Sequence, residues 1–397
     1  MNPEILHPEV QEFINKHLKS EITKLILKGS PFDGVSIQEL ANQIVAKQKS
    51  ERKLPTWFST QKIYYSPKIS IEQTSSEITA NYKSNIISGS SIIDITGGFG
   101  VDCYSFSKKF KKVIHCEINE DLSTIVQYNY QQLEANNIQT FAGNGFNFLK
   151  ETTQTFDCIY IDPSRRNEVK GKVFLLKDCL PEIPPKIDFY FSKTKTILIK
   201  VSPILDISST IKELKNVKEI HIVAVNNEVK ELLFLLEKNY EEQINIKTIN
   251  FGKKSVQKFD FKYQEDVISE YSEPLQYLYE PNAAILKSGA FHHISHQLKI
   301  YKLHQHSHLY TSDQLIDFPG RVFSIENICI YNKKKIRRLL PTKQANITIR
   351  NFPKTVHQIR KETKIKDGGN NYMFFTTLKN NDLSIILCKK LALIHKK

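Results

Sequence analysis

The chain lacks the features that would place it in a membrane or outside the cell. Its six cysteines lie far apart without a Cys-x-x-Cys pair, so they predict neither a zinc site nor a disulfide framework. No stretch approaches the roughly 18 uninterrupted apolar residues that a membrane helix needs. Residues 1–20 hold no signal-peptide core, because Glu4, His7 and Glu9 interrupt their apolar positions. We therefore expect a cytoplasmic protein with no membrane partner.

The chain also has fewer acidic than basic residues. Lys and Arg number 56 against 42 Asp and Glu, which gives a formal net charge of +14. The excess is concentrated in residues 333–366, where Glu362 is the only acid. Apolar residues in the same stretch favour a folded unit that contacts nucleic-acid phosphates, although a solvated basic face without a partner is the alternative. Lys334, Arg337 and Arg338 are the candidate phosphate contacts.

The length of 397 residues and a hydrophobic content of 40% predict two or three domains with real cores. Residues 1–70 read as a helical region. Apolar residues recur at helical spacing over 8–28, and Ser36-Ile37-Gln38-Glu39 matches a capping box that starts a second helix. We found no internal repeat and no low-complexity linker.

Residues 71–253 alternate between strand and helix patterns. Strands separated by helices imply crossover units and a mostly parallel sheet, which is an α/β fold. The expected strands are 91–95, 113–117, 156–162, 196–202, 220–225 and 244–251, and the expected helices are 75–87, 101–110, 122–136, 207–214 and 228–238.

The pattern changes beyond residue 253. Residues 254–322 form a connecting segment with an expected helix near 291–303. Residues 323–397 resemble a small α+β domain, in which strands at 372–378 and 383–388 flank a turn at 380–382.

A glycine-rich turn carries the first chemical signal. An apolar strand ends at Asp94, and Thr96-Gly97-Gly98-Phe99-Gly100 then opens a helix. Glycines let a ligand approach the backbone more closely than a Cβ permits, and the helix N-terminus presents free N–H groups. This strand–loop–helix context indicates a nucleotide cofactor site formed by Asp94, Thr96, Gly98 and Gly100.

Glu117 ends the next expected strand. An acid there can accept both ribose hydroxyls of an adenosine-containing cofactor, and a helix-capping surface acid is the alternative. Taken alone, the glycine turn and Glu117 fit a dinucleotide as well as S-adenosylmethionine.

The strand that ends in Asp162-Pro163 separates these two cofactors. The proline stops the strand and leaves polar groups at the edge where ligands bind open α/β sheets. In a methyltransferase, Asp162 and the adjacent carbonyl would hold the acceptor atom in line with the methyl group, and most of the acceleration would come from positioning. A simple turn at Asp162-Pro163 is the alternative.

These residues resemble those of class I S-adenosylmethionine-dependent methyltransferases, over about residues 73–250. The whole chain is similar to a bacterial group whose methyltransferase core precedes a ferredoxin-like segment and a THUMP-like domain. The C-terminal strings that carry this likeness are Tyr-Glu-Pro-Asn at 279–282, Pro-Gly-Arg at 319–321, Arg-Asn-Phe-Pro at 350–353 and Lys-Asp-Gly-Gly at 366–369. The resemblance implies a Rossmann-like core, S-adenosyl-L-methionine as cofactor, Asn144 at the adenine edge, and Asp162 and Pro163 as the catalytic loop.

The sequence departs from the family pattern at two positions. Asn144 stands where many relatives have Asp, and its side-chain carbonyl can still accept the adenine amino group. Asp162-Pro163 is followed by Ser164-Arg165 and not by the Pro-aromatic pair of enzymes that methylate base amines. Arg165 and Arg166 could meet phosphate oxygens bidentately or form structural ion pairs. Lys200, at the end of the next strand, could contact substrate phosphate or extend toward solvent.

We therefore expect an S-adenosylmethionine-dependent methyltransferase that acts on RNA, with a base of tRNA or rRNA as its target. The alternative is an RNA-binding protein whose methyltransferase core has lost activity, while a nicotinamide-dependent oxidoreductase lacks an evident hydride-transfer partner. No metal is expected, because no acid or cysteine accompanies His292 and His296. The sequence leaves open the RNA, the nucleotide, the methylated atom and the oligomeric state.

Overall fold

The computed structural model describes residues 1–65, 68–165, 175–332, 335–336, 339–340 and 342–391, and it describes residues 68–70 and 165 by their backbone alone. Arg166, Lys334, Arg337 and Arg338, four of the residues predicted to bind substrate, lie outside the described residues. The chain forms two compact units. The first unit is Met1–Lys218 with Leu233–Glu241, and the second unit is Glu219–Leu232 with Glu242–Lys397.

The N-terminal region is helical, as predicted. Its elements are a 3₁₀ turn at Pro3–Leu6 followed by α1 (Pro8–Lys16), α2 (Ile22–Lys28), α3 (Ile37–Lys53), α4 (Pro55–Ser59) and α5 (Lys68–Gln73). The predicted helix over 8–28 is divided into α1 and α2. The capping box of α3 is present, because Ser36 Oγ accepts from the Glu39 N–H and the Glu39 carboxylate accepts from the Ser36 N–H.

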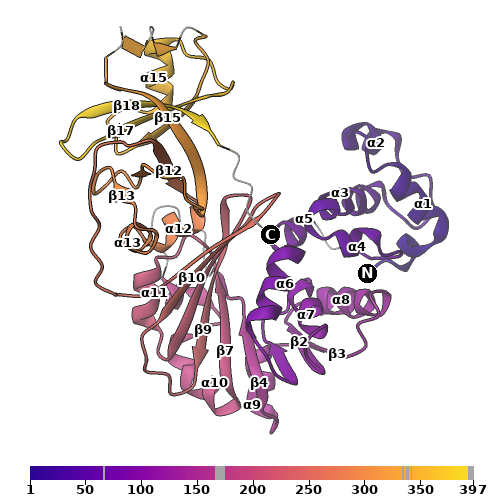
Figure 1. Cartoon of the computed structure of the whole chain (residues 1–397). Helices are drawn as coiled ribbons and strands as arrows, with labels where there is room; N and C mark the ends of the chain where they lie inside the picture. The colour runs from indigo at the N-terminus through magenta and orange to yellow at the C-terminus, as the bar shows by residue number, and fades with distance from the viewer. Residues whose placement is uncertain (66–67, 166–174, 333–334, 337–338, 341, 392–397) are drawn as a thin grey trace. The chain divides into compact units, whose positions relative to one another are not determined.

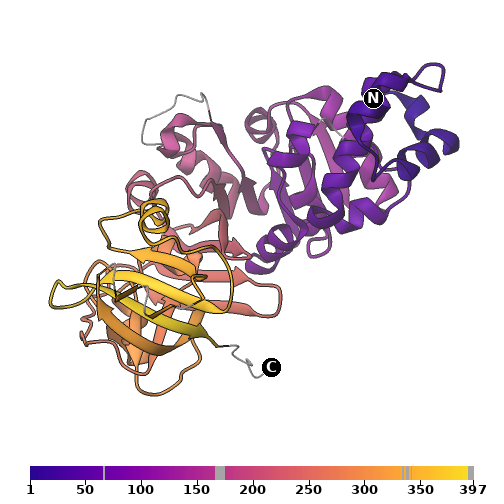
Figure 2. The same ribbon diagram turned by 90° about the horizontal axis from the view of Figure 1, so that it is seen from above.

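The N-terminal helices lie beside the helices of the first unit's core (Figures 1 and 2). The side chain of Asn129, on α8 (Glu120–Gln132), makes two hydrogen bonds of 2.9 Å with the backbone of Tyr64, one to its N–H and one to its carbonyl. Asn129 is 1% exposed. This buried amide therefore fixes the N-terminal segment against the core.

The core sheet has the strand order β11-β10-β8-β9-β7-β4-β1-β2-β3. Its parallel part contains β1 (Ser91–Asp94), β2 (Lys112–Glu117), β3 (Ile138–Ala142), β4 (Phe156–Ile161) and β7 (Thr194–Val201). Each pairing among these strands is parallel. The chain runs outward from β1 to β3 and returns to β4 on the other side of β1. This change of direction is the topological switch point at which open α/β sheets bind ligands.

Helices precede, connect and follow these strands along the chain, which confirms the α/β class and the mostly parallel sheet. They are α6 (Glu77–Ile86), α7 (Val101–Ser107), α8, α9 (Gly145–Glu151), α10 (Ile187–Lys193) and α11 (Ile207–Glu213). A two-stranded sheet pairs β5 (Ser164–Arg165) with β6 (Cys179–Leu180).

The prediction of a helix over residues 228–238 is wrong, because this segment forms strand β9 (Glu228–Glu237). β9 follows β8 (Val217–Val225) through Asn226 and Asn227, which have φ values of 51° and 65°. Two adjacent left-handed residues are typical of the type I′ turn that joins antiparallel strands. The run Leu232–Leu236 is buried throughout, and a short continuous apolar run cannot be assigned to helix or strand by periodicity.

The sheet continues beyond residue 251. Strand β10 (Asn245–Phe251) pairs in parallel with β8, and β11 (Val256–Lys262) adds antiparallel to β10. The sequence pattern predicts that the last strand of the sheet ends at residue 251. The structure adds β11, whose sequence Val-Gln-Lys-Phe-Asp-Phe-Lys is partly polar.

The second unit also contains a seven-stranded sheet of order β13-β14-β12-β15-β18-β17-β16. The strands are β12 (Tyr277–Pro281), β13 (Tyr301–Lys302), β14 (Tyr310–Ser312), β15 (Gly320–Ile330), β16 (Asn346–Arg350), β17 (Asn371–Thr377) and β18 (Leu383–Lys390). Its described helices are α12 (Ala283–Ser288), α13 (His293–Leu298) and α15 (Val356–Thr363). The predicted strand pair at 372–388 is confirmed as the antiparallel pair β17 and β18.

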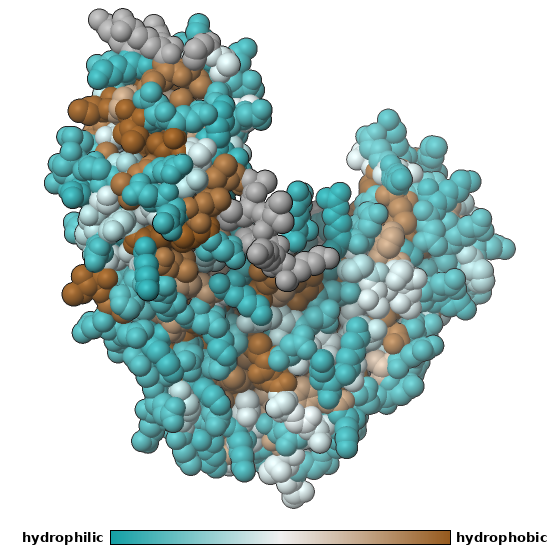
Figure 3. Space-filling model, in the orientation of Figure 1, coloured by the Kyte–Doolittle hydropathy of each residue, from teal (hydrophilic) through white to brown (hydrophobic). Residues whose placement is uncertain are grey.

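The surface visible in Figure 3 is mainly hydrophilic, with hydrophobic patches between the polar regions. Among the described residues, no helix has both the length and the apolar character needed to cross a bilayer.

The only tryptophan of the chain, Trp57, is 1% exposed in the first unit and reports the unfolding of that unit. Replacing the fully buried Leu198 of β7 with alanine removes apolar burial and leaves a cavity, so we expect a decrease in stability of about 2–5 kcal/mol. The matched change Leu27→Ala, at a residue that is 82% exposed, should change stability by less than about 0.5 kcal/mol. Urea unfolding followed by tryptophan fluorescence measures both variants, and equal midpoints would contradict the assigned burial.

Candidate functional site

The glycine turn after β1 links two strand ends through Thr96. Asp94, which is 1% exposed, accepts hydrogen bonds at Oδ1 from the Thr96 N–H (2.8 Å) and the Thr96 hydroxyl (2.9 Å). Thr96 Oγ1 in turn accepts a hydrogen bond from the Asp162 N–H at 2.7 Å. The ends of β1 and β4 are therefore held together, and Asp94 and Asp162 lie in one site.

Glu117 connects the end of β2 to the same turn. Its Oε2 accepts from the Gly98 N–H and its Oε1 accepts from the Asn119 N–H, each at 2.8 Å. The helix that follows is capped by Asn119, whose Oδ1 accepts from the Leu122 N–H. Glu117 is thus not the cap of α8, and its carboxylate faces the glycine turn.

Three glycines of the turn have different surroundings. A Cβ on Gly97 would lie 2.3 Å from the His115 ring, and one on Gly100 would lie 2.2 Å from the Tyr130 hydroxyl oxygen. Gly98 also has a positive φ of 55°, but a Cβ there would meet only the Thr96 carbonyl oxygen, at 3.9 Å. Gly97 and Gly100 are therefore required for packing, whereas Gly98 faces open space.

Asn144 is the N-cap of α9. Its Oδ1 accepts from the N–H groups of Phe146 (2.9 Å) and Asn147 (3.2 Å), so this oxygen already serves the helix. The adjacent Gly145 packs so closely that a Cβ would lie 2.6 Å from Ile95 Cα. Asn144 thus lies beside the glycine turn, and its amide NH₂ group, not its carbonyl, is the part left to contact a ligand.

Asp162 forms an ion pair with Lys200 at the end of β7. The Lys200 side chain is 13% exposed and that of Asp162 is 34% exposed. The pair orients Asp162 and holds Lys200 at the strand ends, so Lys200 does not extend into solvent. Pro163 is partly buried directly after Asp162, and Arg165 lies in β5.

A buried charge network joins α6 to α7, the helix that follows the glycine turn. Asp102 Oδ1 lies 3.2 Å from Nζ of the fully buried Lys83 of α6, and Asp102 Oδ2 accepts from the hydroxyls of Ser75 (2.9 Å) and Tyr160 (2.8 Å). Burial raises the pKa of Asp102, but the Lys83 and Lys200 charges and these hydrogen bonds outweigh it and lower the pKa below its usual value. In the sequence, the one sign of this network was Asp102, an acid in the first turn of the mostly apolar helix α7.

Burial changes the acidity of two groups around the turn. It raises the pKa of Asp94 to about 7, against the opposing hydrogen bonds from Thr96. It lowers the pKa of His115, which packs under Gly97, to about 4. Near neutral pH, His115 is therefore neutral and Asp94 is close to its titration midpoint.

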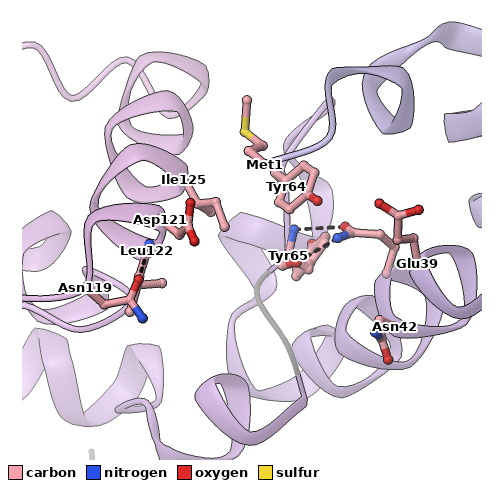
Figure 4. Close-up of a pocket in the computed structure, with 10 residues that line it drawn as sticks. Met1, Glu39, Asn42, Tyr64, Tyr65, Asn119, Asp121, Leu122 and Ile125 are labelled. Atoms are coloured by element: carbon pink, nitrogen blue, oxygen red, sulfur yellow. Dashed lines mark hydrogen bonds between the residues drawn. The ribbon is translucent and has the colours of Figure 1, made fainter. Parts of the chain in front are cut away.

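A separate pocket of about 350 Å³ lies between α3, the segment at Tyr64 and Tyr65, and the start of α8 (Figure 4). Gln43 exchanges two hydrogen bonds with the backbone of Tyr65 at its wall. The pocket adjoins the predicted cofactor residues through Asn119, whose backbone N–H donates to Glu117 Oε1. It is lined by Met1, Glu39, Asn42, Gln43, Tyr64, Tyr65, Asn119, Asp121, Leu122 and Ile125. None of these residues was predicted to be functional.

Among the residues that the structure describes, no three His, Cys, Asp or Glu side chains are grouped so as to hold a metal ion. His292 precedes α13 as its N-cap and donates to or accepts from Ser269 at 2.9 Å, whereas His296 lies within α13.

Three family models match separate parts of the chain. "Conserved hypothetical protein 95" matches residues 70–181, a ferredoxin-like domain matches 277–319 and a THUMP domain-like family matches 320–390. No curated protein matched the chain.

Solved structures give the wider likeness. A putative methyltransferase from Porphyromonas gingivalis W83 is 30% identical, with 98% of each chain covered and a TM-score of 0.89. A putative methyltransferase from Streptococcus mutans in complex with SAH is 17% identical, covering 41% of this chain and 96% of that one, with a TM-score of 0.30. An rRNA methylase from Streptococcus thermophilus is 14% identical, covering 41% and 94%, with a TM-score of 0.30.

The parallel sheet, its switch point and the glycine turn define the class as an α/β methyltransferase fold with smaller C-terminal domains. The chain belongs to the family of the putative methyltransferase from Porphyromonas gingivalis, and ferredoxin-like and THUMP-like domain matches follow its core.

The raised pKa of Asp94 predicts a specific pH dependence of stability. Between about pH 4 and pH 7 the folded state holds a proton on Asp94 that the unfolded state has released, so stability falls as pH rises through this range. We expect wild type to lose up to about 1.4 kcal/mol per pH unit relative to Asp94→Asn, which cannot ionise. Thermal unfolding followed by Trp57 fluorescence measures the difference.

Taking that difference removes the contribution of other groups, such as His115, whose lowered pKa acts in the opposite direction. A constant difference between the two proteins from pH 4 to pH 7 would mean that the Asp94 carboxyl is not desolvated in the folded state.

Proposed function

We propose that the protein is an S-adenosylmethionine-dependent methyltransferase that acts on RNA, with a base of tRNA or rRNA as its target. The main support is the open Gly98 turn at the carboxyl edge of β1, β2 and β4, where Gly98 binds the Glu117 carboxylate and Thr96 binds the backbone N–H of Asp162. This edge is where sheets of this topology bind ligands.

The residues at this edge fit the cofactor. Gly98 leaves room where a side chain would otherwise stand, and Glu117 has oxygen lone pairs beyond its two bonds to backbone N–H groups, which ribose hydroxyls could use. The Asn144 amide would meet the adenine edge, and Asp94 and Thr96 would fix the turn. S-adenosylmethionine supplies an activated methyl group on its sulfonium.

The role of the protein's own residues in the reaction is then to position the methyl acceptor. Asp162 would accept a hydrogen bond from the acceptor group, and Lys200 holds that carboxylate in one orientation. Pro163 ends the strand and keeps the backbone after Asp162 out of the sheet. Because the methyl donor is already activated, alignment of the two reactants accounts for most of the acceleration.

The RNA part of the proposal rests on the C-terminal half and on charge. A THUMP domain-like match covers residues 320–390, and this range includes the basic stretch 333–366. The net charge of +14 favours a polyanionic partner through counterion release. Arg165, Arg166, Lys334, Arg337 and Arg338 remain candidate phosphate contacts.

Gly98→Ala tests the cofactor site, because the added Cβ would occupy the space proposed for the ligand. We expect affinity for S-adenosylhomocysteine to fall at least tenfold, about 1.4 kcal/mol, in isothermal titration calorimetry. Gly289→Ala is the control, since Gly289 also has a positive φ (75°) and no atom within 4 Å of a Cβ. Both variants carry similar backbone strain, so equal affinities would argue against a ligand at Gly98.

Asp162→Asn tests the catalytic assignment. We expect transfer of labelled methyl groups to total RNA to fall by about 10²-fold or more, because the acceptor is no longer aligned, while S-adenosylhomocysteine binding is retained. Asp188→Asn, at an exposed aspartate paired with Lys215, should behave as wild type. A wild-type protein that binds RNA and cofactor but transfers no label would support an inactive core instead.

A further inference from the structure

Three short sequence strings, at 279–282, 319–321 and 350–353, meet in the second unit and have no role in the proposed reaction. Glu280, near the end of β12, lies opposite Arg321 of β15 in the antiparallel register. Arg321 Nε donates to Glu280 Oε2, and Arg350 Nη2, from the end of β16, donates to Glu280 Oε1 at 2.8 Å. One carboxylate thus orients two guanidinium groups from strands far apart in the chain.

The two arginines keep donors that Glu280 does not use, although Arg321 Nη2 also donates to Thr348 Oγ1 at 3.4 Å. The Glu280 side chain is 4% exposed, whereas those of Arg321 and Arg350 are 36% and 33% exposed. Arg350 Nε is buried and has no acceptor among the described residues. Arg360 is a contrast, because its terminal nitrogens bond to the carbonyls of Ile365 and Ala345 and to Asp367.

Arg350 is one of several basic groups that act on His308. His308, whose ring stacks on Phe291, experiences repulsion from Lys302, Arg350, His306 and His292. Burial first, and then these groups, lower the pKa of His308 to about 4, so the ring is neutral near pH 7. Lys302 is fully buried and donates to the Gln305 carbonyl at 3.2 Å. Two guanidinium groups against one carboxylate leave a net charge of +1, in surroundings that favour an anion.

We infer that Arg321 and Arg350 form a phosphate-binding site that contacts the backbone of the substrate RNA. The guanidinium fork matches two phosphate oxygens, and a guanidinium already oriented by Glu280 loses little freedom when it binds. The site adds phosphate-binding groups on β15 and β16 to the candidates in 333–338. It rests on the proposed function only for the identity of the RNA.

Arg321→Gln and Arg350→Gln test the site by fluorescence anisotropy with a labelled tRNA transcript, without cofactor, at several salt concentrations. We expect each variant to bind more weakly. The slope of log affinity against log salt should decrease in magnitude by about 0.7–0.9, because each variant neutralises one phosphate fewer. Arg52→Gln, on the exposed end of α3, removes the same charge elsewhere and should keep the wild-type slope.

Glu280→Gln separates binding from folding. It removes the negative charge that partly neutralises the arginines, while the amide oxygen of Gln can still accept a hydrogen bond from one of them. RNA should therefore bind as tightly as to wild type or more tightly, even if the second unit is less stable. A purely structural role predicts weaker or unchanged binding in all three variants with an unchanged salt slope, and that result would overturn the site. Weaker binding of inorganic phosphate alone, with RNA affinity unchanged, would also overturn it.

Failure of the phosphate site can be distinguished from failure of the proposed methyltransferase function. Absence of methyl transfer with intact RNA binding contradicts only the enzymatic proposal, whereas Arg321→Gln and Arg350→Gln proteins that bind RNA like wild type contradict only the phosphate site.

Discussion

The site depends on a set of hydrogen bonds that hold three strand ends around one short turn. Asp94 fixes Thr96, Thr96 accepts the backbone N–H of Asp162, and Glu117 accepts that of Gly98. Each bond joins a strand end to the turn, so the turn cannot move without disturbing β1, β2 or β4. Gly97 and Gly100 make the close packing contacts of the turn, and Gly98 between them faces open space.

Buried charge underlies this arrangement. Asp94 and Asp102 are both buried, which disfavours their ionised forms. Asp102 is compensated by Lys83, Ser75 and Tyr160, whereas the hydrogen bonds to Asp94 come from uncharged donors. The two carboxyls therefore differ in acidity although they lie on the same strand–turn–helix unit. A third carboxylate, that of Asp162, lies at the edge where the acceptor is proposed to bind, and it forms an ion pair with Lys200.

The second unit also contains a buried carboxylate that is compensated by basic groups. Glu280 is buried and binds two arginines that remain partly exposed, so a structural carboxylate presents cationic groups to solvent. The strings at 279–282, 319–321 and 350–353 therefore meet through this one carboxylate, which binds Arg321 and Arg350.

The sequence by itself determined the elements whose signals are local. The capping box at Ser36, the strand–glycine–helix pattern at 91–107 and the strand ends near Glu117 and Asp162 were all predictable, because turns, caps and short apolar runs depend on neighbouring residues. Only the tertiary structure decided the rest. Residues 228–237 became a strand through the Asn226-Asn227 turn and burial against neighbouring strands, and Asn144 gave its carbonyl to α9. Lys83 met Asp102, and Glu280 met Arg350, because partners separated by 19 and 70 residues are brought together only by packing.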